Sequence, residues 1–242
     1  MKISTMAVIM AMTDEAKPFI EALELKKLAC GLGDALPMEV YTGSVEGANL
    51  IVVVGGKDQR FGVDNVATQP ATLSAYLAIE QFKPDLLINA GTAGGFKAKG
   101  AEIGDVYIGS GAIRFHDRRI PIPGFDGYGV GSYKTPDVDK VAEVLGLKKG
   151  VVSTGNSLDM TPEDQRMIEA NQGAVKEMEA AAIAWVAELY DIPLVALKAI
   201  TDLVDTDTPT QDEFMQNLKF ASERLQKKLT DAVHCFAGEG IA

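Results

Sequence analysis

The chain has 242 residues, of which 47% are hydrophobic, and its 34 Asp and Glu residues outnumber its 23 Lys and Arg residues. This length and apolar content fit one globular domain, which we expect to span residues 1–242. The formal net charge of −11 argues against nucleic acid as a partner, because nucleic-acid-binding proteins carry a basic face. A small or neutral substrate is favoured.

The first predicted element is a buried strand over the apolar segment Met6–Met12. Thr13 or Asp14 is expected to begin a helix that runs through Phe19 and Leu23. The apolar segment is too short to cross a bilayer and has no small-residue cleavage site after it. We therefore expect no membrane partner and a cytoplasmic location.

The next apolar segments predict a hairpin followed by a helix. Val40–Thr42 and Asn49–Val54 flank a glycine-containing turn. Asp64 or Asn65 is expected to begin a helix that ends near Phe82, shortly before a proline.

A glycine-rich segment follows the short predicted strand Leu86–Ala90. Gly91–Gly95 is expected to form a loop whose small residues let the backbone approach a ligand and present N–H groups. It does not match the glycine spacing of the common nucleotide-binding motifs, and a tight structural turn is the alternative. Val106–Gly109 predicts another strand, and Phe115–Gly131 is expected to be a loop.

Strands and helices alternate through the second half of the chain. This alternation predicts an α/β fold, a three-layer sandwich in which helices flank a mixed β-sheet. Ligand sites in such folds lie at the carboxyl ends of strands. The predicted elements are a helix at Pro136–Leu145, a strand at Val151–Thr154, a helix at Glu163–Ala170 with Pro162 in its first turn, a strand at Ala174–Met178, a helix at Glu179–Tyr190, a strand at Pro193–Ile200, and a helix from Thr210 or Asp212 to about Cys235.

Acidic residues follow several of these strands. Glu15 lies one turn into the first helix, Glu177 and Glu179 flank a methionine at a strand end, and Asp202 follows the last apolar strand. Each has an alternative to a catalytic role: helix capping for Glu15, exposure at the surface for Glu177 and Glu179, and a place in a turn for Asp202. A carboxyl group at the end of a buried strand is expected to have a raised pKa, which suits it to hold a proton.

Residues typical of a metal site are sparse. The chain has Cys30, Cys235, His116 and His234, without the spacing of a zinc site or of a disulfide framework. We expect no metal centre.

Four motifs occur along the chain in the following order: Ala11-Met12-x-x-Glu15, Asn89-Ala90-Gly91-Thr92-Ala93-Gly94-Gly95, Glu177-Met178-Glu179-Ala180-Ala181-Ala182, and Thr201-Asp202 followed by Asp212-Glu213-Phe214. In this order they resemble the methylthioadenosine/S-adenosylhomocysteine nucleosidase family of the nucleoside phosphorylase and nucleosidase superfamily. The segments Phe115–Pro123 and Ser157–Met160 resemble its plant-type branch more than its bacterial branch.

The resemblance implies a nucleoside phosphorylase-like fold, a nucleoside substrate, a homodimer, and no metal or organic cofactor. It implies that Glu15 is a general base that activates water and that Asp202 protonates purine N7. It also implies that Glu179 binds the ribose hydroxyls. The remaining residues expected to bind substrate are Met178 beside the sugar, Thr92 near the base, Phe214 against the 5′-alkylthio group, and Met12, Leu158, Glu177 and Thr201.

Two positions depart from the family pattern. Leu158 stands where bacterial relatives usually have an aromatic residue, and Asn156 stands where the family commonly has Asp.

We expect hydrolysis of 5′-methylthioadenosine, and of S-adenosylhomocysteine if its amino-acid tail fits. A purine nucleoside phosphorylase is one alternative, but phosphorylases of this superfamily hold phosphate with arginine, and Ile88, Asn89 and Ala90 precede the glycine-rich segment. Lys57 and Arg60 flank Asp58 and are a weaker phosphate site. A catalytically weak storage protein of the same superfamily is the other alternative.

Overall fold

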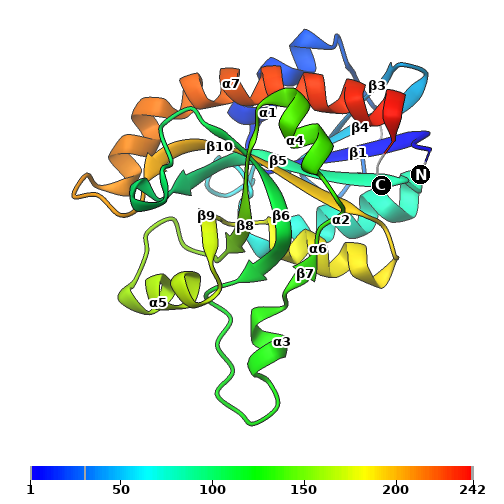
Figure 1. Cartoon of the computed structure of the whole chain (residues 1–242). Helices are drawn as coiled ribbons and strands as arrows, with labels where there is room; N and C mark the ends of the chain where they lie inside the picture. The colour runs from blue at the N-terminus through cyan, green and yellow to red at the C-terminus, as the bar shows by residue number, and fades with distance from the viewer. Residues whose placement is uncertain (1, 30, 241–242) are drawn as a thin grey trace.

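The fold is built around one mixed β-sheet with helices on both faces (Figure 1). It is known from a computed structural model that describes residues 2–29 and 31–240, so Cys30 lies outside the described residues. Every helix in the described part of the chain is too short or too polar to span a bilayer.

The strands run in the order β10-β6-β8-β9-β5-β1-β4-β3-β2, and β7 pairs with β6. Parallel and antiparallel pairs both occur, as predicted: β1 is parallel to β4 and β5, whereas β3 is antiparallel to β4. The strands are β1 Thr5–Met10, β2 Lys26–Lys27, β3 Glu39–Val45, β4 Ala48–Val54, β5 Leu86–Gly95, β6 Val106–Phe115, β7 Tyr133–Lys134, β8 Lys148–Thr154, β9 Gly173–Glu177 and β10 Leu194–Leu203.

Half of this sheet closes on itself. Strand β10 pairs with β6 on one side and with β5 on the other, so that β5, β10, β6, β8 and β9 form a ring. The prediction of a three-layer sandwich is therefore confirmed in part: the mixed sheet is flanked by helices, but this half of it is closed, while β1, β4, β3 and β2 extend from the ring as an open sheet. The closure joins residues about 100 positions apart, such as Leu197 and Ala90, which no local pattern indicates.

Helices cover the two faces of the sheet and bury two apolar clusters. Helices α1, α4 and α7 pack on one face, and α2 and α6 pack on the other (Figure 1). The helices are α1 Thr13–Ala22, α2 Thr68–Phe82, α3 Asp126–Val130, α4 Asp139–Leu145, α5 Pro162–Ala170, α6 Ala180–Leu189 and α7 Thr210–Glu239, with a 3₁₀ turn η1 at Lys97–Lys99.

The prediction that Gly91–Gly95 forms a loop is wrong, because this segment is the second half of strand β5. Its residues pair with β10 from Lys198 to Leu203, and Gly94 and Gly95 also pair with β9. Strand β10 likewise extends to Leu203, past the predicted end at Ile200. Pairing on both sides therefore overrides the turn tendency of glycine.

Helix α2 begins at Thr68, not at Asp64 or Asn65 as predicted. Both polar residues anchor the preceding loop instead. Asp64 Oδ1 accepts hydrogen bonds from the Thr13 amide (3.1 Å) and hydroxyl (2.6 Å), and Asn65 Nδ2 donates to the carbonyl oxygens of Gly55 and Gly56.

The segment 116–132 projects from the body of the molecule as an arm that contains α3 (Figure 1). The prediction of a loop here is wrong in part, because β6 continues to Phe115 and the arm contains a short helix. The Arg118 guanidinium lies over the rings of Phe115 (4.2 Å) and Tyr128 (4.7 Å) and ties the two sides of the arm together.

Candidate active site

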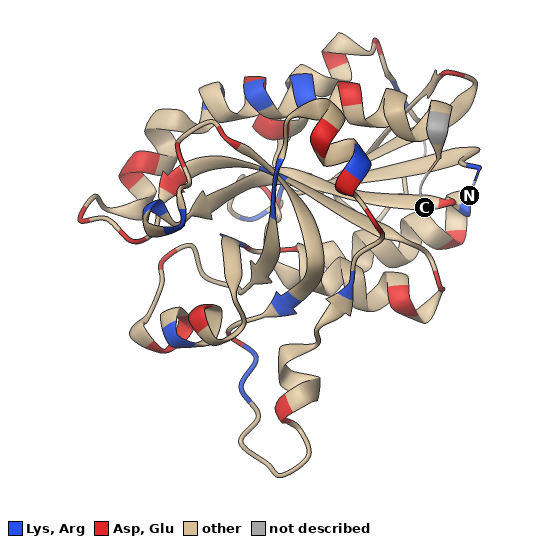
Figure 2. Cartoon of the chain, in the orientation of Figure 1, with Lys and Arg blue, Asp and Glu red and all other residues tan. Residues whose placement is uncertain are grey.

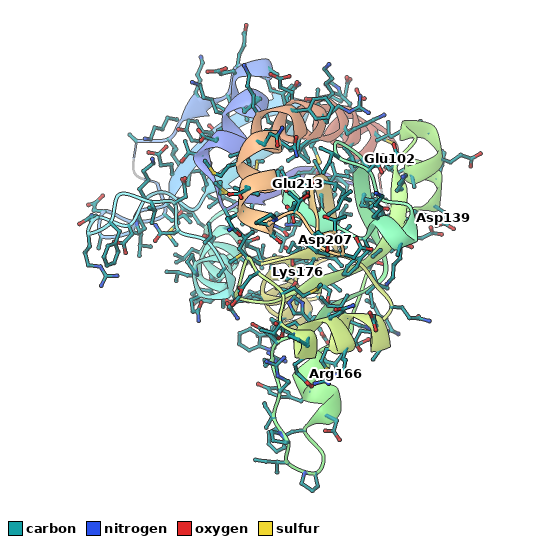
Figure 3. All side chains as sticks on the ribbon, turned by 90° about the vertical axis from the view of Figure 1, so that its left-hand side faces the viewer. Glu102, Asp139, Arg166, Lys176, Asp207 and Glu213 are labelled. Carbon is teal, nitrogen blue, oxygen red and sulfur yellow. The ribbon has the colours of Figure 1, made fainter. Side chains whose placement is uncertain are left out.

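All the predicted site residues line one cavity of about 220 Å³. The cavity lies where β1, β5, β9 and β10 end, as expected for an α/β fold. Lys176, which also lines it, lies near the middle of the face shown in Figure 3, below Glu213 of α7. The predicted residues in the lining are Met12, Glu15, Thr92, Leu158, Glu177, Met178, Glu179, Thr201, Asp202 and Phe214.

Glu15 is buried in the first turn of α1, and β5 holds its carboxylate in place. Its Oε1 accepts hydrogen bonds from the Thr92 amide (2.7 Å) and the Thr92 hydroxyl. Its Oε2 lies against Gly91, where a Cβ atom would approach to 3.2 Å. Burial raises the pKa of Glu15, although the Thr92 bonds and the Lys198 charge oppose this shift. A carboxylate that is fixed in place and readily protonated suits a general base.

Asp202 is buried on β10 beside β5, where the pairing shifts register after Ile200. The Thr201 hydroxyl donates to Asp202 Oδ1 over 2.7 Å. Gly94 makes room for the other oxygen, because a Cβ atom there would lie 2.7 Å from Asp202 Oδ2. Burial raises the pKa of Asp202, so this group keeps a proton to higher pH than an exposed aspartate.

Glu177 forms a fully buried ion pair with Lys198, 2.8 Å from Oε2 to Nζ. Its carboxylate also accepts the Thr154 hydroxyl and the amides of Glu179 and Ala180 at the start of α6. Burial acts to raise the pKa of Glu177, but the charge and hydrogen bond of Lys198 hold it below its usual value. Both carboxylate oxygens have protein partners, so a direct role in binding substrate stays a prediction.

Glu179 is half-buried at the N-terminus of α6, and its Oε1 accepts the Ala67 amide over 2.9 Å. Burial raises the pKa of Glu179 to about 7, and the nearby charges of Glu177 and Glu15 act in the same direction. Glu179 is therefore a carboxyl group at the cavity wall that binds or releases a proton near neutral pH.

Lys176 fixes the segment that carries Leu158. Its Nζ donates to the carbonyl oxygens of Ser157 (2.6 Å) and Leu158 (2.9 Å). Burial lowers the pKa of Lys176, although the charge of Asp202 opposes this. The aliphatic side chain of Leu158 thus stands at the cavity wall in the position where a bacterial relative is expected to stack an aromatic ring.

Sequence reasoning missed Lys198 altogether and did not assign Val66 or Val204 to the site. Val66 and Val204 line the cavity and have no distinctive sequence pattern. Lys198 is 1% exposed, lies in the apolar strand β10, and acts electrostatically on Glu15, Glu177 and Glu179. A lysine in an otherwise apolar strand is itself a signal, because a buried ammonium group needs a partner carboxylate.

Among the described residues that line the cavity, none is an arginine. Arg60 lies elsewhere, exposed and paired with Asp58 at 3.0 Å. Charged residues of both signs are spread over the outer helices (Figure 2). Within the described part of the chain, no group of three or more His, Cys, Asp or Glu side chains is arranged to hold a metal ion.

The chain is similar to known proteins over nearly its whole length. Residues 5–234 match the family model described as the phosphorylase superfamily. A 5′-methylthioadenosine/S-adenosylhomocysteine nucleosidase of Arabidopsis thaliana is 44% identical, covering 99% of this chain and 94% of the relative. A 5′-methylthioadenosine nucleosidase of the same plant is also 44% identical, covering 99% of this chain and 90% of that protein.

Solved structures agree with these matches. The apo structure of an Arabidopsis thaliana 5′-methylthioadenosine nucleosidase superposes with a TM-score of 0.96 at 44% identity, over 99% of this chain and 98% of that one. The futalosine hydrolase of Helicobacter pylori, at 20% identity, superposes with a TM-score of 0.79 and shares the fold.

Proposed function

The chain belongs to the phosphorylase superfamily, and we propose that within it the protein hydrolyses the N-glycosidic bond of 5′-methylthioadenosine to release adenine. The observation that carries this proposal is the convergence of Glu15, Glu179 and Asp202 on one cavity. The names of the Arabidopsis relatives support the substrate, and one of them adds S-adenosylhomocysteine as a second substrate.

Glu15 is proposed to activate the attacking water. Thr92 donates two hydrogen bonds to its Oε1, so we assign Oε2 as the oxygen that accepts a proton from water in the cavity. The raised pKa of Glu15 makes its carboxylate a stronger base than an exposed glutamate.

Asp202 is proposed to protonate the departing base. An unprotonated purine is a poor leaving group because it departs as an anion. Protonation of a ring nitrogen makes it a better one, and the family resemblance implies that this nitrogen is N7. The raised pKa of Asp202 keeps that proton available, and the Thr201 hydroxyl and the space at Gly94 orient the carboxyl group.

Glu179 is proposed to accept hydrogen bonds from the ribose hydroxyls. Cleavage of a glycosidic bond passes through a sugar with oxocarbenium character, and nearby carboxylates stabilise this positive charge. Glu15 and Glu179 lie in the same cavity wall and share the field of Lys198, which offsets part of their mutual repulsion. Met178 and Phe214 supply apolar surface for the sugar and the 5′-alkylthio group.

Water is favoured over phosphate as the attacking group. A phosphate dianion beside Glu15 would need bidentate arginine partners, and the described lining of the cavity contains none. Lys176 lines the cavity, but its ammonium group already donates to two carbonyl oxygens.

The decisive experiment is product analysis after incubation with methylthioadenosine, with and without phosphate. We expect adenine and free methylthioribose in both cases. Glu15→Gln and Asp202→Asn should each lower kcat by about 100-fold or more, the usual effect of removing a general base or acid. Glu21→Gln, a change of an exposed glutamate on the same helix α1, is the control. A sugar 1-phosphate formed only with phosphate would indicate a phosphorylase, and absence of both binding and turnover would indicate a storage protein.

The proposal extends to the assembly and location of the protein. Exposed apolar side chains lie on the arm, at Ile122, Phe125 and Tyr128, and on α2 and α6. Residues from these three elements line one hollow, among them Tyr128, Thr72 and Trp185. Exposed apolar side chains gathered on neighbouring elements are typical of a subunit interface, so we propose a homodimer formed through the arm, α2 and α6. The cytoplasmic location and the single domain stay predictions.

A further inference from the structure

Helix α2 has no N-terminal cap of its own. Its N-cap residue is Ala67, whose side chain cannot accept a hydrogen bond, and no acidic residue lies in its first turn. Ala67 also has a φ of 76°, in the region that favours glycine. Side chains from elsewhere in the chain accept the first two amides of this segment. Glu179 Oε1 accepts the amide of Ala67 (2.9 Å), and Asn156 Oδ1 accepts the amide of Thr68 (3.2 Å).

Asn156 is held on its other side by the base of the arm. Its backbone amide and its Nδ2 both donate to Asp117 Oδ2, over 2.6 and 2.9 Å. Its Oδ1 also accepts the Thr68 hydroxyl over 2.6 Å. A continuous series of hydrogen bonds and short backbone links therefore joins Asp117, Asn156, the start of α2 and Glu179.

The chemistry of this series requires an amide at position 156. The side chain must donate to the Asp117 carboxylate and accept from Thr68 at the same time, and only an amide has both functions at this length. An aspartate at position 156 would place two carboxylates at hydrogen-bond distance, where like charges repel. This accounts for the asparagine that departs from the family pattern.

We propose that Asn156 and Asp117 are positioning residues that hold the start of α2 so that the Ala67 amide fixes the Glu179 carboxylate against the sugar. The inference rests on the proposed role of Glu179 in binding ribose. The unfavourable backbone conformation of Ala67 supports this inference, because such conformations persist only where surrounding contacts enforce them.

Asn156→Asp tests the proposal, and the reciprocal double variant Asp117→Asn/Asn156→Asp is its rescue. The single variant should lower kcat/KM for methylthioadenosine about five- to tenfold, the effect of losing one or two hydrogen bonds. The double variant again pairs one amide with one carboxylate, now with the amide at position 117 and the carboxylate at position 156. It should recover most of the lost kcat/KM. Asn49→Asp, the same chemical change at an exposed site on β4, should leave kcat/KM unchanged.

A substrate without the 2′ and 3′ hydroxyl groups separates positioning from general damage. On 2′,3′-dideoxy-methylthioadenosine, wild type and Asn156→Asp should have equal kcat/KM, because Glu179 then has no hydroxyl to bind. An equal loss on both substrates, no loss on either, or no recovery in the double variant would overturn the inference.

Hydrogen exchange gives a readout that does not depend on the proposed reaction. Exchange at the amides of Ala67, Thr68 and Gln69, which precede Pro70, should be faster in Asn156→Asp than in wild type and should return to the wild-type rate in the double variant. Unchanged exchange in the single variant would overturn the inference by itself. Failure of the wild type to release adenine would instead overturn the proposed function.

Discussion

At the scale of single residues, the ionisation of Glu179 depends strongly on its surroundings. Burial raises its pKa from 4.5 to about 7, so the folded protein binds this proton more tightly than the unfolded chain does. Glu179 therefore contributes to stability at low pH, and the contribution is lost as the pH rises from about 4.5 to about 7.

Glu179→Gln should for this reason stabilise the protein only where the carboxylate is charged. We expect its Tm to exceed that of wild type by a few degrees at about pH 8 and to match it at about pH 4. Scanning calorimetry at the two pH values measures the difference. Glu188→Gln, an exposed substitution on the same helix, should show no such difference between the two pH values. A gain of equal size at both pH values would show that packing, and not ionisation, sets the effect.

The acidic residues of the site could be predicted because each follows a strand and lies in a recognisable motif. Lys198 could not be placed in the same way. Its partner Glu177 lies 21 positions earlier on β9, a strand that does not pair with β10, so the ion pair depends on how the ring closes. Asn156 departs from the family pattern, but the hydrogen bonds that suggest its role depend on the positions of Asp117 and Thr68 in the fold.

At the scale of elements, β5 combines structural pairing with space for the carboxyl groups that we propose to be catalytic. The close approach of other groups that its glycines predicted is confirmed, although the segment is a strand and not a loop. In the structure the groups that approach are Glu15 at Gly91 and Asp202 at Gly94. Gly94 also lines the cavity together with Thr92 and Ala93, so the approach of a ligand to this segment stays a prediction.

Gly94→Ala should therefore displace Asp202. The added Cβ atom would lie 2.4 Å from Val204 Cγ1 and 2.7 Å from Asp202 Oδ2, so at least one of these residues must move. We expect adenine release to fall about 100-fold, since a shift of about 1 Å in a catalytic group has that effect. Steady-state kinetics measures the loss, and circular dichroism checks that the fold is kept. Gly127→Ala is the control, because a Cβ atom there meets nothing within 4 Å. Wild-type activity in Gly94→Ala would contradict this role of the glycine.

Strong periodicity made the helices more predictable than the strand ends. The predicted helix at Glu163–Ala170 with Pro162 in its first turn is confirmed as α5, and Thr210 does begin α7. Strands β5, β6 and β10 each extend beyond the predicted end, because pairing with distant strands continues through glycine and polar residues. The two-residue strands β2 and β7 are too short for any pattern.

At the scale of the whole molecule, the apolar surface over the arm, α2 and α6 predicts association. Light scattering should give a mass about twice that of the 25.8 kDa chain. Trp185→Glu puts a charge in the hollow between these elements and should yield a monomer. Val144→Glu, an equally polar change on α4 at the opposite face, should remain a dimer. A dimeric Trp185→Glu protein would show that the interface lies elsewhere.

Asp202 and Gly94 lie on the pairing between β10 and β5, the one that closes the ring of strands. Many enzymes carry their reacting groups on loops that fluctuate independently of the rest of the chain. Here the proposed proton donor lies in a paired strand of the ring, so its release requires opening of the pairing between β10 and β5, and we expect local opening at this point to be rare. The proposed protonation step thereby takes place on a rigid part of the molecule.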